Sequence, residues 1–179
     1  AECTDDIDLD PVSFPLMSMR EGMVAGVSAR VFRVSFTGEL SYEINVPASY
    51  GISVWTAMVT AGEKYGITPY GTEAMHVLRA EKGYIIVGQE TDGTTTPQDL
   101  GMDWIVSKKK DFLGRRSFDL EDNRRQDRKQ LVGLLPDDQT KVIPEGSQIT
   151  SRQQERSLMG SRIPMIGHVT SSYYSANMG

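Results

Sequence analysis

Hydrophobic positions in the first part of the chain follow the spacing of strands. Residues 27–36 carry apolar side chains at positions of both parities, for example Val31 and Phe32. This pattern predicts a strand with some burial on each face. The turn-like residues 37–40 lead into a second run at residues 41–46, which we expect to pair with the first strand.

Two helices are predicted after these strands. The first follows Pro47 and has an apolar stripe at helical spacing that consists of Ile52, Trp55 and Val59. We expect this stripe, Trp55 included, to be buried against the sheet. The second helix is predicted to start at Thr72, a favourable N-cap residue, and to stop at Gly83.

The rest of the chain is more polar and is punctuated by turns. Residues 88–101 predict a turn-rich loop, residues 104–106 a short strand, and residues 117–129 an exposed, charged helix. From Leu131 onward, short apolar runs are separated by Pro136, Pro144, Gly146, Gly160, Pro164 and Gly167. Short strands with such punctuation are typical of a small β-barrel or sandwich.

The order of these elements predicts the α+β class. We expect residues 1–128 to form an antiparallel sheet with packed helices, and residues 129–179 to form a small C-terminal β-barrel. The boundary is placed near residue 128, where a charged stretch gives way to short apolar runs.

The composition is that of a soluble globular protein, with 39% hydrophobic and 24% charged residues. No apolar run approaches the roughly 18 residues of a membrane helix, and the start lacks the features of a signal peptide. The single Cys3 cannot form an internal disulfide, and no Cys/His cluster suggests a metal, so a reducing cytoplasm is predicted. The net charge of -5 argues against nucleic-acid binding. The chain begins without methionine, which indicates a fragment or a processed chain.

Generic catalytic signatures are absent from the sequence. It contains no Gly-rich phosphate loop, no Gly-x-Ser-x-Gly elbow and no His-Glu-x-x-His motif. His76 lies beside core positions of a predicted helix, so we interpret it as a structural residue. No catalytic residue is assigned.

The carboxylates Glu39 and Glu43 are better candidates for a binding site. Glu43 stands between Tyr42 and Ile44, an apolar setting in which a carboxylate needs hydrogen-bond donors. The paired N–H and NH₂ groups on the edge of an aminopterin ring match its two oxygens. An exposed strand acid is the alternative interpretation of Glu43.

Two segments of the chain carry a family resemblance. Residues 33–44, Arg-Val-Ser-Phe-Thr-Gly-Glu-Leu-Ser-Tyr-Glu-Ile, resemble the Arg-x-x-Tyr-Thr-Gly-Glu-x-x-Phe-Glu-Ile signature of the aminomethyltransferase family, whose founder is the glycine-cleavage T-protein. Residues 78–84, Leu-Arg-Ala-Glu-Lys-Gly-Tyr, resemble Leu-Arg-Leu-Glu-Ala-Gly-Tyr of the same family. Residues 96–97 and 167–171 also fall at family positions. The order and spacing of these pieces cover almost the whole chain.

The resemblance implies the aminomethyltransferase folate-binding fold, with tetrahydrofolate as the ligand. In the family, the acid that matches Glu43 binds the pterin edge. Positions that match Phe36 and Tyr84 line the ring, where aromatic side chains suit a flat heterocycle. Phe36 stands where the family often has tyrosine, so a hydroxyl group is lost. Glu39 is the fourth cofactor-binding candidate.

Within the family, residues 66–83 and 128–135 are similar to the alpha subunits of heterotetrameric sarcosine oxidases. T-proteins carry Gly-Ala-Arg-Asp where this chain has residues 73–76, so Met75 stands at the position of an arginine that contacts the pterin. The similarity implies oxidative demethylation of sarcosine to glycine, transfer of the one-carbon unit to tetrahydrofolate, and release of hydrogen peroxide.

The same similarity implies further cofactors and partners. FAD, FMN and NAD are expected in the intact complex but not in this segment. The expected partners are the beta, gamma and delta subunits and the preceding part of the alpha subunit. Since the catalytic aspartate of T-proteins belongs to an earlier segment, this segment alone is expected to be inactive. The alternatives are a T-protein, a dimethylglycine oxidase-like folate enzyme, and a noncatalytic module that serves subunit packing.

Nine of the 19 lysines and arginines lie between Lys108 and Lys129. Acidic residues are interleaved with them, so the simplest interpretation is a solvated surface. The alternatives are attraction of the glutamate tail of a folate, or docking on an acidic surface of another subunit. We expect one or two of Lys108, Lys109 and Lys110 to serve either role, and residues 124–129 to be solvated.

Overall fold

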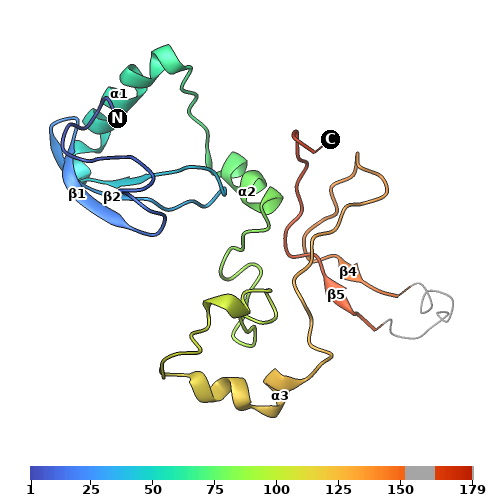
Figure 1. Ribbon diagram of the computed structural model, residues 1–179. Coiled ribbons are helices and arrows are strands. Elements are labelled where there is room, and N and C mark those ends of the chain that lie inside the picture. Colours follow the sequence, from blue (N-terminus) through green and yellow to red (C-terminus); the bar gives the residue numbers. More distant parts are fainter. Residues whose placement is uncertain (152–163, 179) are drawn as a thin grey trace. The chain divides into compact units, whose positions relative to one another are not determined.

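Figure 1 shows the computed structural model, which describes residues 1–151 and 164–178. The chain divides by its packing into two compact units, a first unit of residues 1–84 and a second unit of residues 85–179. The described residues contain antiparallel sheets and a few helices, which agrees with the predicted α+β class.

The first unit contains a three-stranded antiparallel sheet in the order β1-β2-β3, formed by Met19–Val24, Val27–Phe32 and Glu43–Asn45. The predicted pairing of the two apolar runs is confirmed, since β2 pairs with β3 with Phe32 opposite Glu43. On β2, Ala29 and Val31 are buried whereas Ser28 and Arg30 are exposed. The sheet therefore presents mainly one face to the core.

Strand β1 was not predicted from the sequence. Of its residues only Val24 is buried, so the apolar alternation that marks a half-buried strand is missing. A tight turn at Ala25 and Gly26, which have φ values of 50° and 76°, folds β1 back onto β2. Positive φ at both central residues is what a two-residue hairpin turn requires. The carboxylate of Asp6 also accepts a hydrogen bond from the Met23 backbone N–H at 2.9 Å.

The apolar core of the first unit is small. Among the described residues, its fully buried hydrophobic members are Ile7, Phe14, Val24, Ala29, Val31 and Val54. Gly22 on β1 lets the N-terminal segment approach closely, because a Cβ at that position would lie only 2.5 Å from the Ile7 side chain. Segments from the N-terminus, the sheet and the first helix thus share one core.

Helix α1 spans Gly51–Gly62, as predicted, and packs on this core through Val54. The predicted burial of the stripe that contains Ile52 and Trp55 is wrong, because these side chains are 83% and 58% exposed. Residues 51–62 include no charged residue, so apolar side chains occur on both faces of the helix. The periodicity fits either face, and the core contacts the one that carries Val54 and Met58.

Helix α2 spans Thr72–Glu81 in agreement with the sequence, and Gly83 follows it with a φ of 70°. The predicted cap differs in detail, since Gly71 occupies the N-cap position and Thr72 is the first helical residue. No helix among the described residues combines the length and apolar character needed to cross a bilayer.

The second unit has little regular structure. Its described elements are a 3-10 turn over Asp103–Ile105, a second over Arg115–Asp119, α3 over Glu121–Arg124, and β4 (Gln148–Ile149) paired antiparallel with β5 (Gly167–His168). The strand predicted at residues 104–106 is wrong, because a 3-10 turn lies there. The charged helix predicted over residues 117–129 occurs only as short turns, which extended backbone at Leu120 interrupts.

Long-range polar contacts hold parts of the second unit together. The Gln89 side-chain amide donates to Glu145 Oε1 at 2.9 Å, to the Thr170 carbonyl at 3.0 Å and to Ser171 Oγ at 2.9 Å. Among the described residues the predicted β-barrel is represented only by the β4–β5 pair. The predicted turn at Gly160 lies outside the described residues.

The two faces of α1 should respond differently to a charge. In this chain, Val54→Lys places an ammonium group in the core and should lower the free energy of unfolding by more than about 3 kcal/mol. Ile52→Lys, two residues away on the exposed face, should change it by less than about 0.5 kcal/mol. Urea denaturation of both variants measures the difference. Equal losses would show that the Ile52 face is also covered.

Candidate functional site

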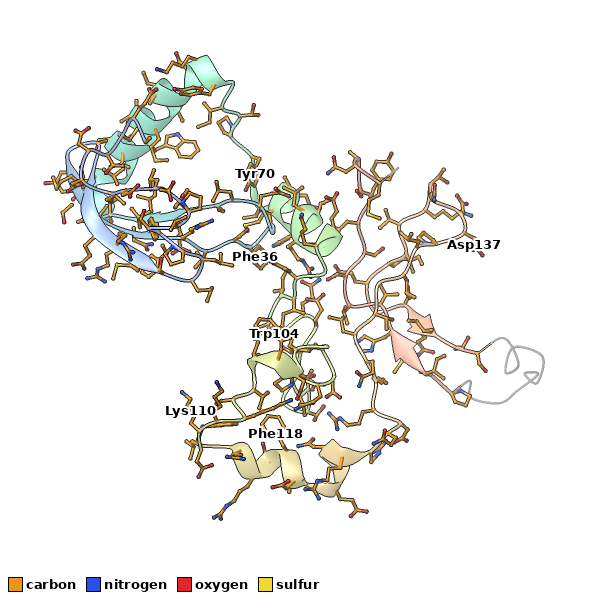
Figure 2. All side chains as sticks on the ribbon, in the orientation of Figure 1. Phe36, Tyr70, Trp104, Lys110, Phe118 and Asp137 are labelled. Carbon is orange, nitrogen blue, oxygen red and sulfur yellow. The ribbon has the colours of Figure 1, made fainter. Side chains whose placement is uncertain are left out.

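The two segments that carry the sequence signatures lie against each other in the first unit. We call residues 33–42, which connect β2 to β3, the signature loop. Gly38 in this loop has a φ of 79°, and a Cβ built on it would lie 2.6 Å from Cγ of Lys82, just beyond α2. Lys82 Nζ also lies 3.1 Å from Glu39 Oε1. Residues more than 40 positions apart in the sequence therefore form one surface, and Figure 2 labels Phe36 on the loop beside α2.

The signature loop is anchored at both of its ends. Arg33 Nη1 donates to the backbone carbonyls of Pro11 at 3.0 Å and Phe14 at 2.6 Å. At the other end, the Tyr42 hydroxyl donates to the Leu9 carbonyl at 3.1 Å. Both anchors tie the loop to the N-terminal segment, and between them Phe36, Glu39 and Leu40 are exposed.

The four predicted cofactor-binding residues belong to the first unit and are accessible. Phe36 is 36% exposed and Tyr84 is 45% exposed. Glu43 is exposed on β3, where its Oε1 accepts a hydrogen bond from Asn45 Nδ2 at 3.0 Å. Glu39 is paired with Lys82, and its side chain is 70% exposed. The structure thus joins Glu39 to the segment that ends in Tyr84, whereas Glu43 bonds to Asn45 and not to the other candidates.

A hollow of about 240 Å³ lies beside the signature loop. Its lining consists of Leu16, Arg33, Gly38, Glu39, Leu40 and Ser41. The hollow is bordered by the loop itself, so a ligand that enters it would contact signature residues.

Arg79 supports the end of α2, a role that the sequence pattern did not indicate. Its side chain is almost completely buried, and Nη1 donates to the Tyr84 carbonyl at 3.1 Å. The Tyr84 N–H donates in turn to the Arg79 carbonyl at 2.9 Å. These reciprocal bonds fix the turn that presents Tyr84. The only signal in the sequence was an arginine next to the apolar stripe of the helix.

The two other α2 residues singled out in the sequence are half-buried. Met75 and His76 lie in the first half of the helix. Among the described residues, no group of three His, Cys, Asp or Glu side chains could hold a metal ion.

A largely buried ion pair lies in the second unit. Arg128 Nη2 lies 2.6 Å from Asp99 Oδ2, and Nε donates to Oδ1 at 2.9 Å. The Thr96 N–H and hydroxyl donate to the same carboxylate at 2.8 and 2.9 Å. The hydrogen bonds from Arg128, followed by those from Thr96, lower the pKa of Asp99 from 3.8 to about 2. The prediction that residues 124–129 are all solvated is therefore wrong for Arg128, whose side chain is 13% exposed.

Other members of the basic segment fit the solvated interpretation. Lys108 pairs with Asp103 at 3.2 Å, and Arg125 pairs with Asp127 at 2.8 Å, all with exposed side chains. Lys110, labelled in Figure 2, is also exposed. Exposed pairs of this kind contribute little to stability.

Comparisons with known proteins match the chain over its whole length. The model of the GCVT N-terminal domain matches residues 1–110. The sarcosine oxidase alpha subunit of Corynebacterium sp. (strain P-1) is 49% identical over 180 residues, which cover 100% of this chain and 18% of the relative. The sarcosine oxidase alpha subunit of Rhizobium meliloti (strain 1021) is 40% identical over 177 residues, which cover 97% of this chain and 17% of the relative. An aminomethyltransferase of Thermotoga sp. (strain RQ2) is 33% identical over 162 residues, which cover 90% of this chain and 41% of the relative. The chain therefore spans less than a fifth of the sarcosine oxidase alpha subunits that it matches.

The Asp99–Arg128 pair should make stability depend on acid pH. Because the pKa of Asp99 is lower in the folded protein than in the unfolded chain, its contribution is present above about pH 4. It is lost as the pH falls from about 4 to 2, by about 2 kcal/mol in total. Denaturation curves of the wild-type protein and Asp99→Asn across this range measure the effect. A difference between them that does not change with pH would contradict it.

Proposed function

The chain belongs to the GCVT N-terminal domain family, and on this premise we propose that it binds tetrahydrofolate as part of a sarcosine oxidase alpha subunit. The observation that carries the proposal is the contact between the signature loop and Lys82, which joins the two family segments into one surface. The 49% identity to a sarcosine oxidase alpha subunit over the whole chain supports the choice within the family.

The chemistry of the four candidate residues supports binding of a pterin ring. Glu43 accepts a hydrogen bond from Asn45 through Oε1, and Oε2 remains available to the paired donors of a pterin edge. Phe36 and Tyr84 offer accessible rings for stacking on a flat heterocycle. Glu39 is proposed to contribute at the rim, since Lys82 already offsets its charge. Bound tetrahydrofolate would supply the acceptor for a one-carbon unit.

For the complete protein, we propose the reaction of its sarcosine oxidase relatives. Sarcosine and oxygen are consumed, glycine and hydrogen peroxide are formed, and the methyl carbon, oxidised by two electrons, passes to tetrahydrofolate. FAD, FMN and NAD are proposed for the intact complex, and no residue of this chain is assigned to them. In this reaction the chain binds and orients the folate.

The identity to sarcosine oxidase alpha subunits also supports a proposal for the setting of the chain. We propose that it works in the cytoplasm with beta, gamma and delta subunits and with further parts of its own subunit. We also propose that residues 1–128 belong to a folate-binding domain and residues 129–179 to a β-barrel. The antiparallel pairing of β4 with β5 is compatible with a barrel.

The alternative within the family is an aminomethyltransferase of the T-protein type, which the 33% identity to such an enzyme favours. A dimethylglycine oxidase-like folate enzyme would use the same surface. Peroxide formation distinguishes these enzymes. A sarcosine oxidase forms peroxide with sarcosine, a dimethylglycine oxidase-like enzyme forms it with dimethylglycine, and an aminomethyltransferase forms none with either. A noncatalytic packing module would not bind folate at all.

Glu43→Gln tests the proposed pterin contact. The change removes the negative charge but keeps the size, and a hydrogen bond to a charged group contributes about 1.5–3 kcal/mol. The dissociation constant of tetrahydrofolate with the intact protein should therefore rise about tenfold or more. Glu21→Gln, on the exposed face of β1, is the matched control and should leave the constant unchanged. Equal constants for Glu43→Gln and the wild-type protein would assign Glu43 a structural role.

A further inference from the structure

We propose that Lys82 is a positioning residue, which holds the tip of the signature loop in the conformation that binds folate. This inference rests on the proposed function. It concerns a residue that does not itself need to touch the ligand, because it acts through the loop that carries Phe36 and leads to Glu43.

The first observation is steric. The Lys82 stem lies across the Gly38 backbone so closely that a Cβ on Gly38 would be 2.6 Å from Cγ, 2.8 Å from Cδ and 3.1 Å from Cε. Three consecutive carbons of one side chain thus follow the surface of the loop. Lysine stems commonly cover neighbouring groups in this way while the ammonium group stays in water.

The second observation is that the anchors hold only the ends of the loop, whereas the tip contacts Lys82. Arg33 and Tyr42 bind the N-terminal segment, and residues 36–40 between them form bends without helix or strand pairing. Thr37 is buried, but Gly38 and Glu39 meet Lys82. The conformation of the tip therefore depends on a side chain that belongs to the α2 segment.

The third observation links this contact to both halves of the proposed site. Lys82 stands two residues before Tyr84, whose backbone is held by the buried Arg79. One side chain thus connects the loop that carries Phe36 with the turn that presents Tyr84. A shift of Lys82 would change the relation between the two aromatic rings that are proposed to stack on the pterin.

The stem and the charge of Lys82 have separable roles. The Lys82–Glu39 pair is exposed, with side-chain accessibilities of 46% and 70%, so its charge contributes little. We therefore assign the positioning effect mainly to the stem. Lys82→Met keeps most of the stem and removes the charge, whereas Lys82→Ala removes both.

The experiment measures tetrahydrofolate affinity and backbone hydrogen exchange in the intact protein. Lys82→Ala should weaken binding about tenfold, and Lys82→Met less than about threefold. Amides of residues 36–41 should exchange faster in Lys82→Ala. The control is Lys64→Ala, which removes another exposed Lys–Glu pair, that with Glu2 at 2.7 Å, and should change neither quantity.

A second pair of variants tests the contact itself. Gly38→Ala places a methyl group where the Lys82 stem lies, so it should displace the stem. Its loss should be at least as large as that of Lys82→Ala, because a residue with a Cβ is also strained at the φ of 79°. In the Gly38→Ala background, Lys82→Ala should then cause little further loss, because the contact is already broken. Additive losses would overturn the proposal.

The outcomes separate this inference from the proposed function. Unchanged exchange at residues 36–41 in Lys82→Ala, or faster exchange with unchanged folate affinity, would overturn the positioning role. Failure of the wild-type protein to bind tetrahydrofolate would overturn the proposed function instead. A large loss in Lys82→Met would assign the effect to the charge and also contradict the role of the stem.

Discussion

The burial of Phe14 is the contact on which the first unit depends. The ring is completely buried, and its centroid lies 5.7 Å from that of Tyr42. The guanidinium of Arg20 lies over the ring at 5.1 Å, and the Phe14 carbonyl receives a hydrogen bond from Arg33. One residue thereby connects β1, the end of β2 and the end of the signature loop. The site can be outward-facing because its supports converge on a single buried ring.

The two units reach order by different physical means. In the first, the sheet and α1 bury apolar side chains, which is the dominant favourable contribution to folding. In the second, the residues that are fully buried among those described are polar, Thr96 and Asp99. Removing one partner of a buried pair leaves an uncompensated charge, so such a network tolerates substitution poorly. A ligand site on the surface suits the first unit, because its apolar core is separate from the residues that are proposed to bind the ligand.

The sequence predicted those features that local patterns determine. The β2–β3 pairing and α2 follow from short apolar runs with turn or cap residues at their ends. Pattern alone could not select the buried face of α1, because Val54 and Trp55 are both apolar and only the tertiary core distinguishes them. The burial of Arg79 and Arg128 was also beyond the sequence, since charged residues are usually exposed. Glu39 and Glu43 were singled out by their setting in the sequence, whereas Phe36 and Tyr84 came from the resemblance. The role proposed for Lys82 required the structure.

The contacts of Gln89 have a consequence for the order in which the chain folds. Its amide binds Ser171, 82 positions later in the sequence (171 − 89), so these hydrogen bonds close a long segment. Closing such a segment has an entropic cost that local turns avoid, and topologies rich in distant contacts fold slowly. On the ribosome, Gln89 emerges well before its partners, whereas the β1–β2 hairpin can form as soon as it leaves the exit tunnel. The first unit therefore has its native contacts available earlier in synthesis than the second.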